Sequence, residues 1–399
     1  MQAVMMVAGK STRTYPLTLT RPKPLLPIIN RPMIYFNLDQ MVGLVDEVVL
    51  IVGYRKDKIE DLLGEEYKGM AIIYQEQKEQ LGTGHAVLQA APHITDRFLV
   101  LNGDDLFARV DMEKISEFPY GALAMQAPNP QDFGVMTTNE KGQLVKMVEK
   151  PKEFVSDLVN VGCYVFEPDI FDVLENLQPS IRGEIELPDA VLGIAKKEPV
   201  QVVPLAGYWL PTGYPWYMLT TERYLYDHYD LEYKIEGEIE SGVSIEGNVA
   251  IGPNTIVKTG VHIQGPVTIG ANCVLENDVE IKPYTSIGNG VAIGANSLLE
   301  GSILFNRVKV GLDASVSYSV VGENVLINDN CNLLSTSKNG ANVHSMVKEK
   351  LVDTGLAQYG ATLADNVFLR KGVTVQPGVK VWPGKQIPEG KMVDSDLMD

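Results

Sequence analysis

The sequence predicts an α/β fold in two parts, a Rossmann-like doubly wound domain followed by a parallel β-helix. Two observations carry this prediction. Up to about residue 233, short apolar runs typical of buried strands alternate with amphipathic segments typical of helices. In the remainder, aliphatic residues recur at intervals of six, separated by Gly, Asn, Asp and Pro. We therefore expect domains at residues 1–233 and 234–399.

The composition limits the classes of function. The chain has 399 residues, 45% hydrophobic and 21% charged, which is typical of a folded protein with a large core. A net charge of −17 argues against general binding to nucleic acid or to an anionic membrane. The three cysteines are far apart and no apolar run approaches about 18 residues, so we expect no disulfide framework, zinc site or membrane span. The expected location is a reducing cytoplasm.

The first apolar run, residues 4–8, predicts a buried parallel strand that leads into a turn of small residues at 9–13. The backbone N–H groups of such a turn, at the carboxyl end of a strand, can surround an anion. Arg13 and Lys23 follow at fixed offsets and could hold separate phosphate charges. Taken alone, the stretch is equally well explained as a solvated basic loop.

The same reasoning places the other elements of the first domain. Strands are expected at 47–52, 71–74 and 98–101, with helices at 30–41, 58–63 and 84–91. A smaller antiparallel layer is expected at 134–136, 144–148 and 160–166, with helices at 187–195 and 216–233. Ligands of doubly wound domains bind at the carboxyl ends of strands, where three polar loops, 9–13, 80–85 and 102–105, are predicted to lie.

The hexapeptide register is unbroken over ten positions. They are Ile245, Ile251, Val257, Ile263, Ile269, Leu275, Ile281, Ile287, Ile293 and Leu299. Each triangular coil is expected to have three short faces, and stacking of the coils buries the periodic side chains in one column. The register is lost between residues 302 and 360 and returns at Leu369, Val375 and Val381.

Short motifs follow one another through the first domain. They are Gly-x-Ser-Thr-Arg at 9–13, Arg-Pro-Lys-Pro at 21–24, Gln-Leu-Gly-Thr-Gly-His-Ala at 80–86, Asn-Gly-Asp at 102–104, Phe-Gly-Val at 133–135, Glu-Lys-Pro at 149–151, Asn-x-Gly at 160–162 and Gly-Glu-Ile-Glu-Leu-x-Asp-Ala at 183–190. Their order resembles that of the sugar-1-phosphate nucleotidylyltransferases. With the hexapeptide block, the chain is similar to the bifunctional N-acetylglucosamine-1-phosphate uridylyltransferase/acetyltransferase type, which implies a nucleotidyltransferase domain followed by a left-handed β-helix.

The resemblance implies an enzyme that makes an NDP-sugar and pyrophosphate from a nucleoside triphosphate, UTP or dTTP, and a hexose-1-phosphate. Cations and positioning would supply most of the catalysis. By resemblance, Arg13 neutralises the leaving pyrophosphate, Lys23 contacts the α-phosphate and Asp104 holds Mg²⁺. The implied nucleotide-binding residues are Ala8, Gly9, Ser11 and Thr12 around the triphosphate and Gln80, Gly82 and Thr83 at the base. The implied sugar-phosphate site is Gly134, Glu149, Lys150, Asn160 and Gly162.

Two departures from the family pattern affect the nucleotidyltransferase site. Ser11 replaces the second glycine of the first turn, where glycine would permit a positive φ. Pro211 stands where the family has the aspartate of Trp-x-Asp-x-Gly, its second magnesium ligand, and proline cannot coordinate a cation. The metal would then depend on Asp104, with Asp105 as a further candidate. The alternative is a regulatory homologue that binds a sugar nucleotide without turnover.

A third departure concerns acetyl transfer in the β-helix domain. Leu312 stands where the histidine base of bifunctional relatives is expected, and Gln358 replaces a lysine of their pattern. Neither side chain can act as a general base, and His344 fits better as a solvated loop residue. Amino-sugar acetyl transfer is therefore disfavoured. The β-helix is expected to be an assembly module, with a homotrimer as the expected oligomer.

Overall fold

The structure is a computed structural model. It describes residues 1–398, and for Asp132 it describes the backbone only. It forms two compact units. The first comprises Met1–Lys10, Pro22–Leu25 and Met33–Pro211, and the second comprises Ser11–Arg21, Leu26–Pro32 and the chain from Thr212 onward. The domain boundary at 233 and 234 stays a prediction from the sequence.

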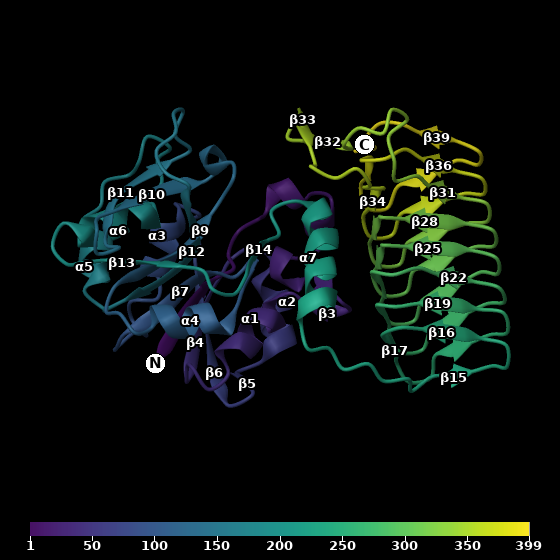
Figure 1. The fold of residues 1–399 in the computed structure, drawn as a ribbon, viewed down its shortest axis with the longest axis horizontal. Coiled ribbons are helices and arrows are strands. Elements are labelled where there is room, and N and C mark those ends of the chain that lie inside the picture. Colours follow the sequence, from purple (N-terminus) through teal and green to yellow (C-terminus); the bar gives the residue numbers. More distant parts are fainter. Residues whose placement is uncertain (399) are drawn as a thin grey trace. The chain divides into compact units, whose positions relative to one another are not determined.

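A mixed ten-stranded sheet forms the centre of the first unit (Figure 1). Its main path has the order β11-β10-β12-β7-β1-β4-β6-β5. The parallel strands are β1 (Gln2–Met6), β4 (Glu47–Val52), β6 (Met70–Glu76) and β7 (Phe98–Asn102). The antiparallel side consists of β10 (Gly134–Thr138), β11 (Leu144–Glu149) and β12 (Leu158–Phe166), with β9 (Gly121–Gln126) and β13 (Gln201–Pro204) alongside and β5 (Glu66–Tyr67) at the opposite edge.

Successive residues of each strand point to opposite faces of the sheet. Because these strands are largely apolar, both faces carry apolar side chains, and helices cover both. Val4 packs in one apolar cluster with α3 (Thr83–Leu88), α5 (Ile170–Glu175) and α6 (Leu187–Ala195). Its neighbour Met5 packs in another cluster with α1 (Ile34–Met41), α2 (Lys56–Leu63) and α4 (Arg109–Ile115). The doubly wound prediction is confirmed, although β1 ends at Met6, two residues before the expected end.

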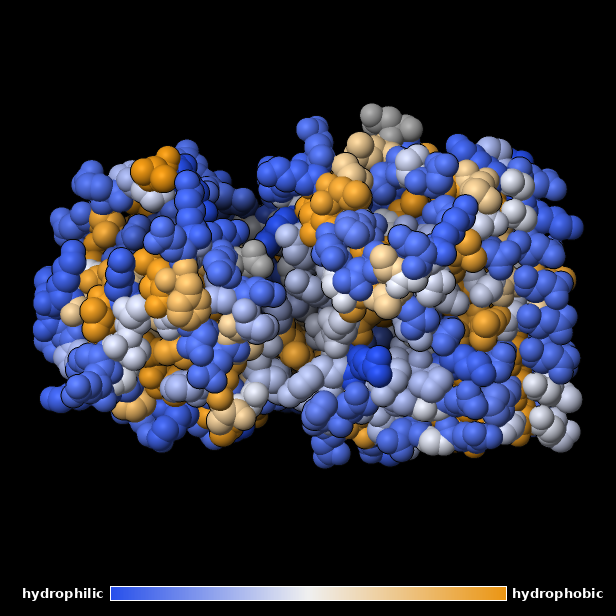
Figure 2. Space-filling view, turned by 45° about the horizontal axis from the view of Figure 1, so that its top comes forward, coloured by the Kyte–Doolittle hydropathy of each residue, from blue (hydrophilic) through white to orange (hydrophobic). Residues whose placement is uncertain are grey.

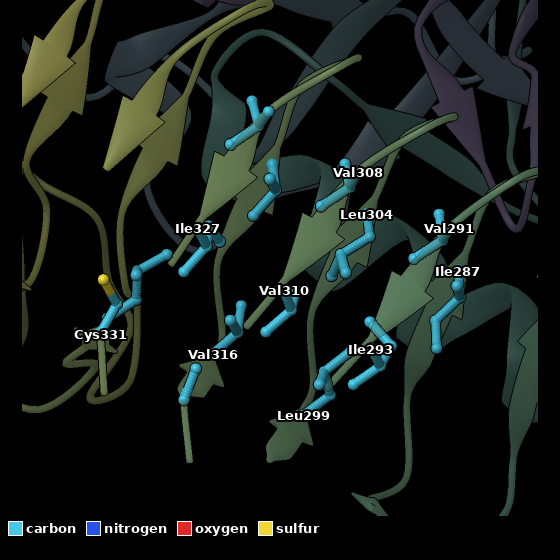
Figure 3. Packing of buried hydrophobic residues seen from close by; sticks show 14 of the residues in the cluster. Ile287, Val291, Ile293, Leu299, Leu304, Val308, Val310, Val316, Ile327 and Cys331 are labelled. Carbon is cyan, nitrogen blue, oxygen red and sulfur yellow. The ribbon is translucent and has the colours of Figure 1, made fainter. Parts of the chain in front are cut away.

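The second unit is built on a parallel β-helix, which confirms the hexapeptide prediction. Its strands form three parallel sheets, which begin with β15 (Glu238–Ile239), β16 (Ser244–Glu246) and β17 (Val249–Ile251). Val249 pairs with Val267 and Val267 with Thr285, so one coil takes eighteen residues, or three hexapeptides. The repeating aliphatic side chains stack into one buried column inside the coils (Figure 3).

The apparent loss of register after residue 302 has a structural explanation. Ile287 pairs with Leu304, only seventeen residues later, and Leu304 pairs with Val321 at the same shorter interval. The shortened corners contain Gly301 and Tyr318, both with positive φ. The coils then continue to Leu333, and an insertion carrying the hairpin of β32 (His344–Val347) and β33 (Lys350–Asp353) precedes the next coil. The β-helix is therefore continuous where the sequence pattern is not.

Helix α7 (Pro215–His228) belongs to the second unit and packs against the β-helix. Its Glu222 is fully buried, and Oε1 accepts hydrogen bonds of 2.6 Å from the backbone N–H of Ile29 and from Ser286 Oγ. One turn further, the Tyr226 hydroxyl lies 2.8 Å from Thr268 Oγ1. The helix ends at His228 rather than at the predicted residue 233, because the next residue is extended.

The surface view shows hydrophilic residues over most of the displayed face, with hydrophobic ones scattered among them (Figure 2). Among residues 1–398, none of the helices combines the length and the apolar character that crossing a bilayer requires.

Candidate functional site

In the first unit, the sequence motifs gather at one end of five neighbouring strands, β11, β10, β12, β7 and β1. Met6 at the end of β1 pairs with Asn102 at the end of β7. In β12, Gly162 lies so close to Asn102 that a Cβ at this glycine would collide with the amide of Asn102. The carboxyl ends of the two parallel strands therefore meet the antiparallel layer at this edge.

The predicted sugar-phosphate residues lie together at the same edge. Gly134 pairs with Glu149 across β10 and β11. A Cβ on Gly134 would lie 3.0 Å from Glu149 Oε2 and 3.7 Å from Asn160 Cβ. Gly162 has a φ of +78°, a conformation that favours glycine. The missing side chain of Gly134 thus leaves the Glu149 carboxylate close to the Cβ of Asn160.

Hydrogen bonds fix the orientation of Asn160. Its Oδ1 accepts a hydrogen bond of 3.1 Å from the N–H of Gly162, and its Nδ2 donates one of 2.6 Å to the Tyr164 hydroxyl. Burial raises the pKa of the Tyr164 hydroxyl above its usual range. Lys150, which follows Glu149, is exposed and has a φ of +43°.

Lys23 and two aspartates form the charged centre of this edge. The Lys23 side chain is only 2% exposed, and its Nζ lies 2.9 Å from Asp104 Oδ2 and 3.9 Å from Asp105 Oδ1. Asp104 is 37% exposed and Asp105 is 13% exposed. A buried ammonium group is costly unless it is paired, so Lys23 holds both carboxylates close to it. The structure therefore brings predicted Lys23 and Asp104 together.

Asp105 lies opposite Pro211 in a two-stranded ladder of β8 (Asp105–Phe107) and β14 (Trp209–Pro211). Trp209 Nε1 donates a hydrogen bond of 3.1 Å to Asp105 Oδ2. Buried Asp111 accepts hydrogen bonds from the N–H groups of Ala206 and Gly207 and so anchors the segment that enters β14. Pro211, which stands where the resemblance implies an aspartate, is thus directly across from the carboxylate of Asp105.

The chemistry of this pair fits a hard divalent cation. Mg²⁺ is commonly held by one or two carboxylates together with substrate phosphates. Within residues 1–398, no group of three His, Cys, Asp or Glu side chains could hold a metal ion by itself. A cation at Asp104 and Asp105 would therefore need oxygen ligands from a bound substrate.

The predicted base-reading residues have structural partners of their own. Gln80 Nε2 donates a hydrogen bond of 2.7 Å to the carbonyl oxygen of Ala8, which links this segment to the first turn. Gly82 has a φ of +105° and lies against the backbone of Ile185. Thr83 Oγ1 accepts a hydrogen bond of 3.1 Å from the N–H of Leu187, the first residue of α6. Gly9 is exposed at the end of the segment that follows β1.

The remaining residues of the first turn belong to the second unit. Ser11 has a φ of +49° and a ψ of +53°, so it adopts the left-handed conformation that glycine would adopt at lower cost. Its carbonyl oxygen accepts hydrogen bonds from the Thr14 N–H and the Thr18 hydroxyl. Thr12 begins a single 3₁₀ turn, Thr12–Thr14. Arg13 in this turn is exposed, with its guanidinium 5.4 Å from the ring centre of Tyr214.

The sequence reasoning missed several residues that shape these groups. Asn102, Trp209 and Tyr214 each contact a predicted site residue. A signal existed for each of them, since Asn102 begins the Asn-Gly-Asp motif and Trp209 and Tyr214 flank the Pro211 segment that the motif comparison singled out.

The residues considered for acetyl transfer lie on the surface of the second unit. Leu312 is 47% exposed, Gln358 is exposed, and His344 is exposed with Nδ1 3.2 Å from the Asn342 carbonyl oxygen.

Comparisons with known proteins agree with this arrangement. Residues 2–225 match the model of a family described as nucleotidyl transferase, and residues 263–395 match one described as the GMPPB C-terminal domain. The chain is 38% identical over 369 residues to the bifunctional protein GlmU of Methanocaldococcus jannaschii, covering 92% of this chain and 88% of that protein. It is 31% identical to a bifunctional sugar-1-phosphate nucleotidylyltransferase/acetyltransferase of Sulfurisphaera tokodaii. That match covers 94% of this chain and 92% of that protein.

Among solved structures, a UDP-glucose pyrophosphorylase complexed with UDP-glucose matches with a TM-score of 0.53 and 24% identity. The match covers 57% of this chain and 98% of that one, and it supports the fold.

Proposed function

Because the chain belongs to the nucleotidyl transferase family, we propose that it joins a hexose-1-phosphate to the nucleotidyl group of UTP or dTTP. The products are an NDP-sugar and pyrophosphate. The observation that carries this proposal is the gathering of Lys23, Asp104, Glu149 and Asn160 at one edge of the sheet. A cation, a carboxylate pair and polar groups for a sugar are the parts that the reaction needs.

In the proposed reaction, an oxygen of the sugar phosphate attacks the α-phosphorus of the triphosphate. A new P–O bond forms while the bond between the α-phosphorus and the bridging oxygen to the β-phosphate breaks, and the electron pair leaves with pyrophosphate. Both reactants are anions, so neutralising and positioning their charges supplies most of the catalysis. Lys23 contacts the α-phosphate, and Arg13 neutralises the departing pyrophosphate.

Asp104 and Asp105 would hold Mg²⁺. When bound, the cation neutralises phosphate charge and orients the phosphate oxygens. In the chain, the Lys23 ammonium lies 2.9 Å from Asp104 Oδ2 and so holds this carboxylate in place.

Each remaining motif is assigned to one part of the substrates. Ala8, Gly9, Ser11 and Thr12 surround the triphosphate. The base is read by Gln80, Gly82 and Thr83, whose segment is tied to the Ala8 carbonyl through Gln80.

The sugar-phosphate site is built from the antiparallel layer. Glu149 and Asn160 contact sugar hydroxyls, and Lys150 contacts the phosphate. Gly134 and Gly162 complete this site, and the absence of side chains at these two positions lets Glu149 and Asn102 lie close to the backbone. The fixed amide of Asn160, held by Gly162 and Tyr164, supports a role in orienting a hydroxyl group.

The test is a panel of UTP, dTTP and other nucleoside triphosphates against hexose-1-phosphates with Mg²⁺, followed by pyrophosphate release. We expect turnover with UTP or dTTP and at least one sugar phosphate. Absence of turnover across the whole panel would overturn the proposed reaction.

A second candidate function is binding of a sugar nucleotide without turnover, as in a regulatory homologue. Pro211 favours it, because a proline occupies the place of a family metal ligand and only Asp105 faces it from the paired strand. This function predicts that calorimetry detects NDP-sugar binding while no combination of substrates in the panel releases pyrophosphate. Pro211→Asp and Ser11→Gly would then raise turnover, whereas wild-type turnover at an ordinary rate would dismiss this candidate.

For the β-helix we propose assembly rather than acetyl transfer. Leu312 and Gln358 cannot accept a proton as a general base. The proposed assembly is a closed homo-oligomer, with a trimer as the expected state. Light scattering at micromolar concentration tests it, and a monomer mass would refute it.

A further inference from the structure

An aromatic cluster in the second unit connects Arg13 with the insertion of the β-helix. The Arg13 guanidinium lies 5.4 Å from the ring centre of Tyr214. The Tyr214 ring is stacked on Trp216, with centres 4.4 Å apart and planes inclined by 6°. Trp216 in turn meets the edge of Tyr359, with ring centres 5.8 Å apart and planes inclined by 64°. Three ring contacts thus lead from an exposed cation to the interior of the unit.

The two inner rings of this aromatic cluster, those of Trp216 and Tyr359, are buried and held by several contacts. Trp216 is 1% exposed and Tyr359 is fully buried, and both pack with Val343 and Val347 of the hairpin insertion. Tyr359 donates its backbone N–H to the Ser335 carbonyl oxygen at 2.8 Å, and its hydroxyl is hydrogen-bonded to Thr362 Oγ1. The insertion that interrupts the coils therefore covers the two innermost rings.

Trp216 is held in this position by packing. Its Nε1 is buried and has no hydrogen-bond partner among the residues that the structure describes. A buried N–H without a partner is costly, so the surrounding apolar contacts must compensate for it. The orientation of this ring therefore depends on the rings and aliphatic side chains around it, Tyr359 included.

The Arg13 side chain is exposed. An exposed arginine side chain samples many rotamers unless a contact restricts it. A ring face beneath the guanidinium restricts these rotamers and adds a cation–π attraction. A Cβ on Gly213 would lie 3.5 Å from the guanidinium, so the backbone beside Tyr214 also borders it.

We propose that Tyr214, Trp216 and Tyr359 are positioning residues that hold the Arg13 guanidinium ready for the phosphates of the nucleotide. The inference rests on the proposed function, in which Arg13 meets the leaving pyrophosphate. It gives the hairpin insertion a role in nucleotide binding, because the insertion keeps the inner rings in place.

The test measures binding of UTP and dTTP to the full chain by calorimetry in the presence of Mg²⁺. Tyr214→Ala should weaken binding about two- to fivefold, the range of an exposed cation–π contact. Tyr214→Phe keeps the ring and should bind as the wild type does. Tyr359→Leu keeps an apolar side chain in the buried site but removes the ring, and it should weaken binding in the same direction.

The discriminating measurement repeats these variants in an Arg13→Ala background. If the rings act through Arg13, Tyr214→Ala and Tyr359→Leu cause no further loss once the guanidinium is gone. Tyr284→Ala is the matched control, since it removes the ring that lies 4.7 Å from the Arg223 guanidinium in the same unit. This control should leave nucleotide affinity unchanged.

Two outcomes would overturn the inference. One is an unchanged affinity in Tyr214→Ala. The other is an equal loss with and without Arg13, which would indicate general damage to the unit. If the wild type binds neither UTP nor dTTP, the proposed function fails and the inference fails with it. If the wild type binds and the ring variants have the same affinity, the inference alone fails.

Discussion

Replacing the buried Glu222 by glutamine is predicted to change how the stability of the protein depends on pH. Burial raises the pKa of Glu222 from the 4.5 of an exposed glutamate to about 8, although the hydrogen bonds from Ser286 and Ile29 oppose this rise. The carboxyl group is therefore neutral in the folded chain at pH 7. Within residues 1–398, Oε1 has two hydrogen-bond donors and Oε2 has no partner.

The direction of the effect follows from proton binding. Between pH 4.5 and about 8 the folded chain keeps the proton of Glu222, while the unfolded chain releases it. The free energy of unfolding therefore falls as the pH rises through this window, and it levels off above it. At 1.36 kcal/mol for each pH unit, the full loss is about 5 kcal/mol.

Glu222→Gln preserves the shape and the Oε1 acceptor but cannot ionise. We expect wild type and variant to have similar stability at about pH 5 and the variant to be more stable by several kcal/mol at about pH 9. Urea unfolding followed by tryptophan fluorescence across this range measures the difference, since Trp216 lies in the same helix. The exposed Glu113→Gln is the control. Parallel pH profiles for wild type and Glu222→Gln would refute the reasoning.

The other predictions concern catalysis and the β-helix core. Lys23→Met should lower kcat for pyrophosphate release by about 100-fold or more, because the variant cannot stabilise charge at the α-phosphate. A steady-state assay with UTP or dTTP measures this, and a near-normal kcat would contradict it. Chelation of divalent cations should abolish pyrophosphate release, and added Mg²⁺ should restore it; release that continues in excess chelator would exclude the proposed metal. Leu299→Ala should cost about 2–5 kcal/mol of unfolding free energy, since Leu299 is fully buried in the column of coils. Leu312→Ala, at a half-exposed leucine, should change stability by less than about 0.5 kcal/mol in the same urea experiment, and equal effects of the two would contradict the packing argument.

The β-helix was predictable because its determinant is local and periodic. Each coil repeats the same burial pattern, so aliphatic residues at intervals of six report the fold directly. The period fails at Gly301 and Tyr318, where a corner is one residue shorter, and at the hairpin insertion. In all three places the strands still pair in register with the previous coil, and that pairing is not visible in the spacing.

The site was predictable only in part. Motifs at strand ends could be expected at one edge, and Glu149, Asn160 and Asp104 do lie at that edge. The pairing of Pro211 with Asp105 joins residues more than a hundred positions apart, which no local pattern encodes. The hydrogen bond from the Leu187 N–H to Thr83 Oγ1 is likewise a tertiary contact. It gives a structural role to Thr83, which the sequence predicted to contact the nucleotide base.

The contacts within the second unit argue that the β-helix supports the nucleotide motifs. Arg21 follows the first turn and ends the segment Ser11–Arg21, and its guanidinium lies 2.5 Å from Asp365 and 2.9 Å from Glu323 of the β-helix. The Thr20 hydroxyl donates a further hydrogen bond of 2.7 Å to Asp365. Asp365 and Arg21 are both largely buried, where a broken ion pair is far more costly than at the surface.

The same unit holds α7 through Glu222 and carries the rings beneath Arg13. Both ends of the segment Ser11–Arg21 are therefore fixed on residues that pack with the coils. Under the proposed function this segment contacts the triphosphate, and reordering its N–H groups and cations on binding would cost affinity. Within the proposed function, the β-helix supplies that rigidity through its continuous core, which is a role for the coils that does not depend on acetyl transfer.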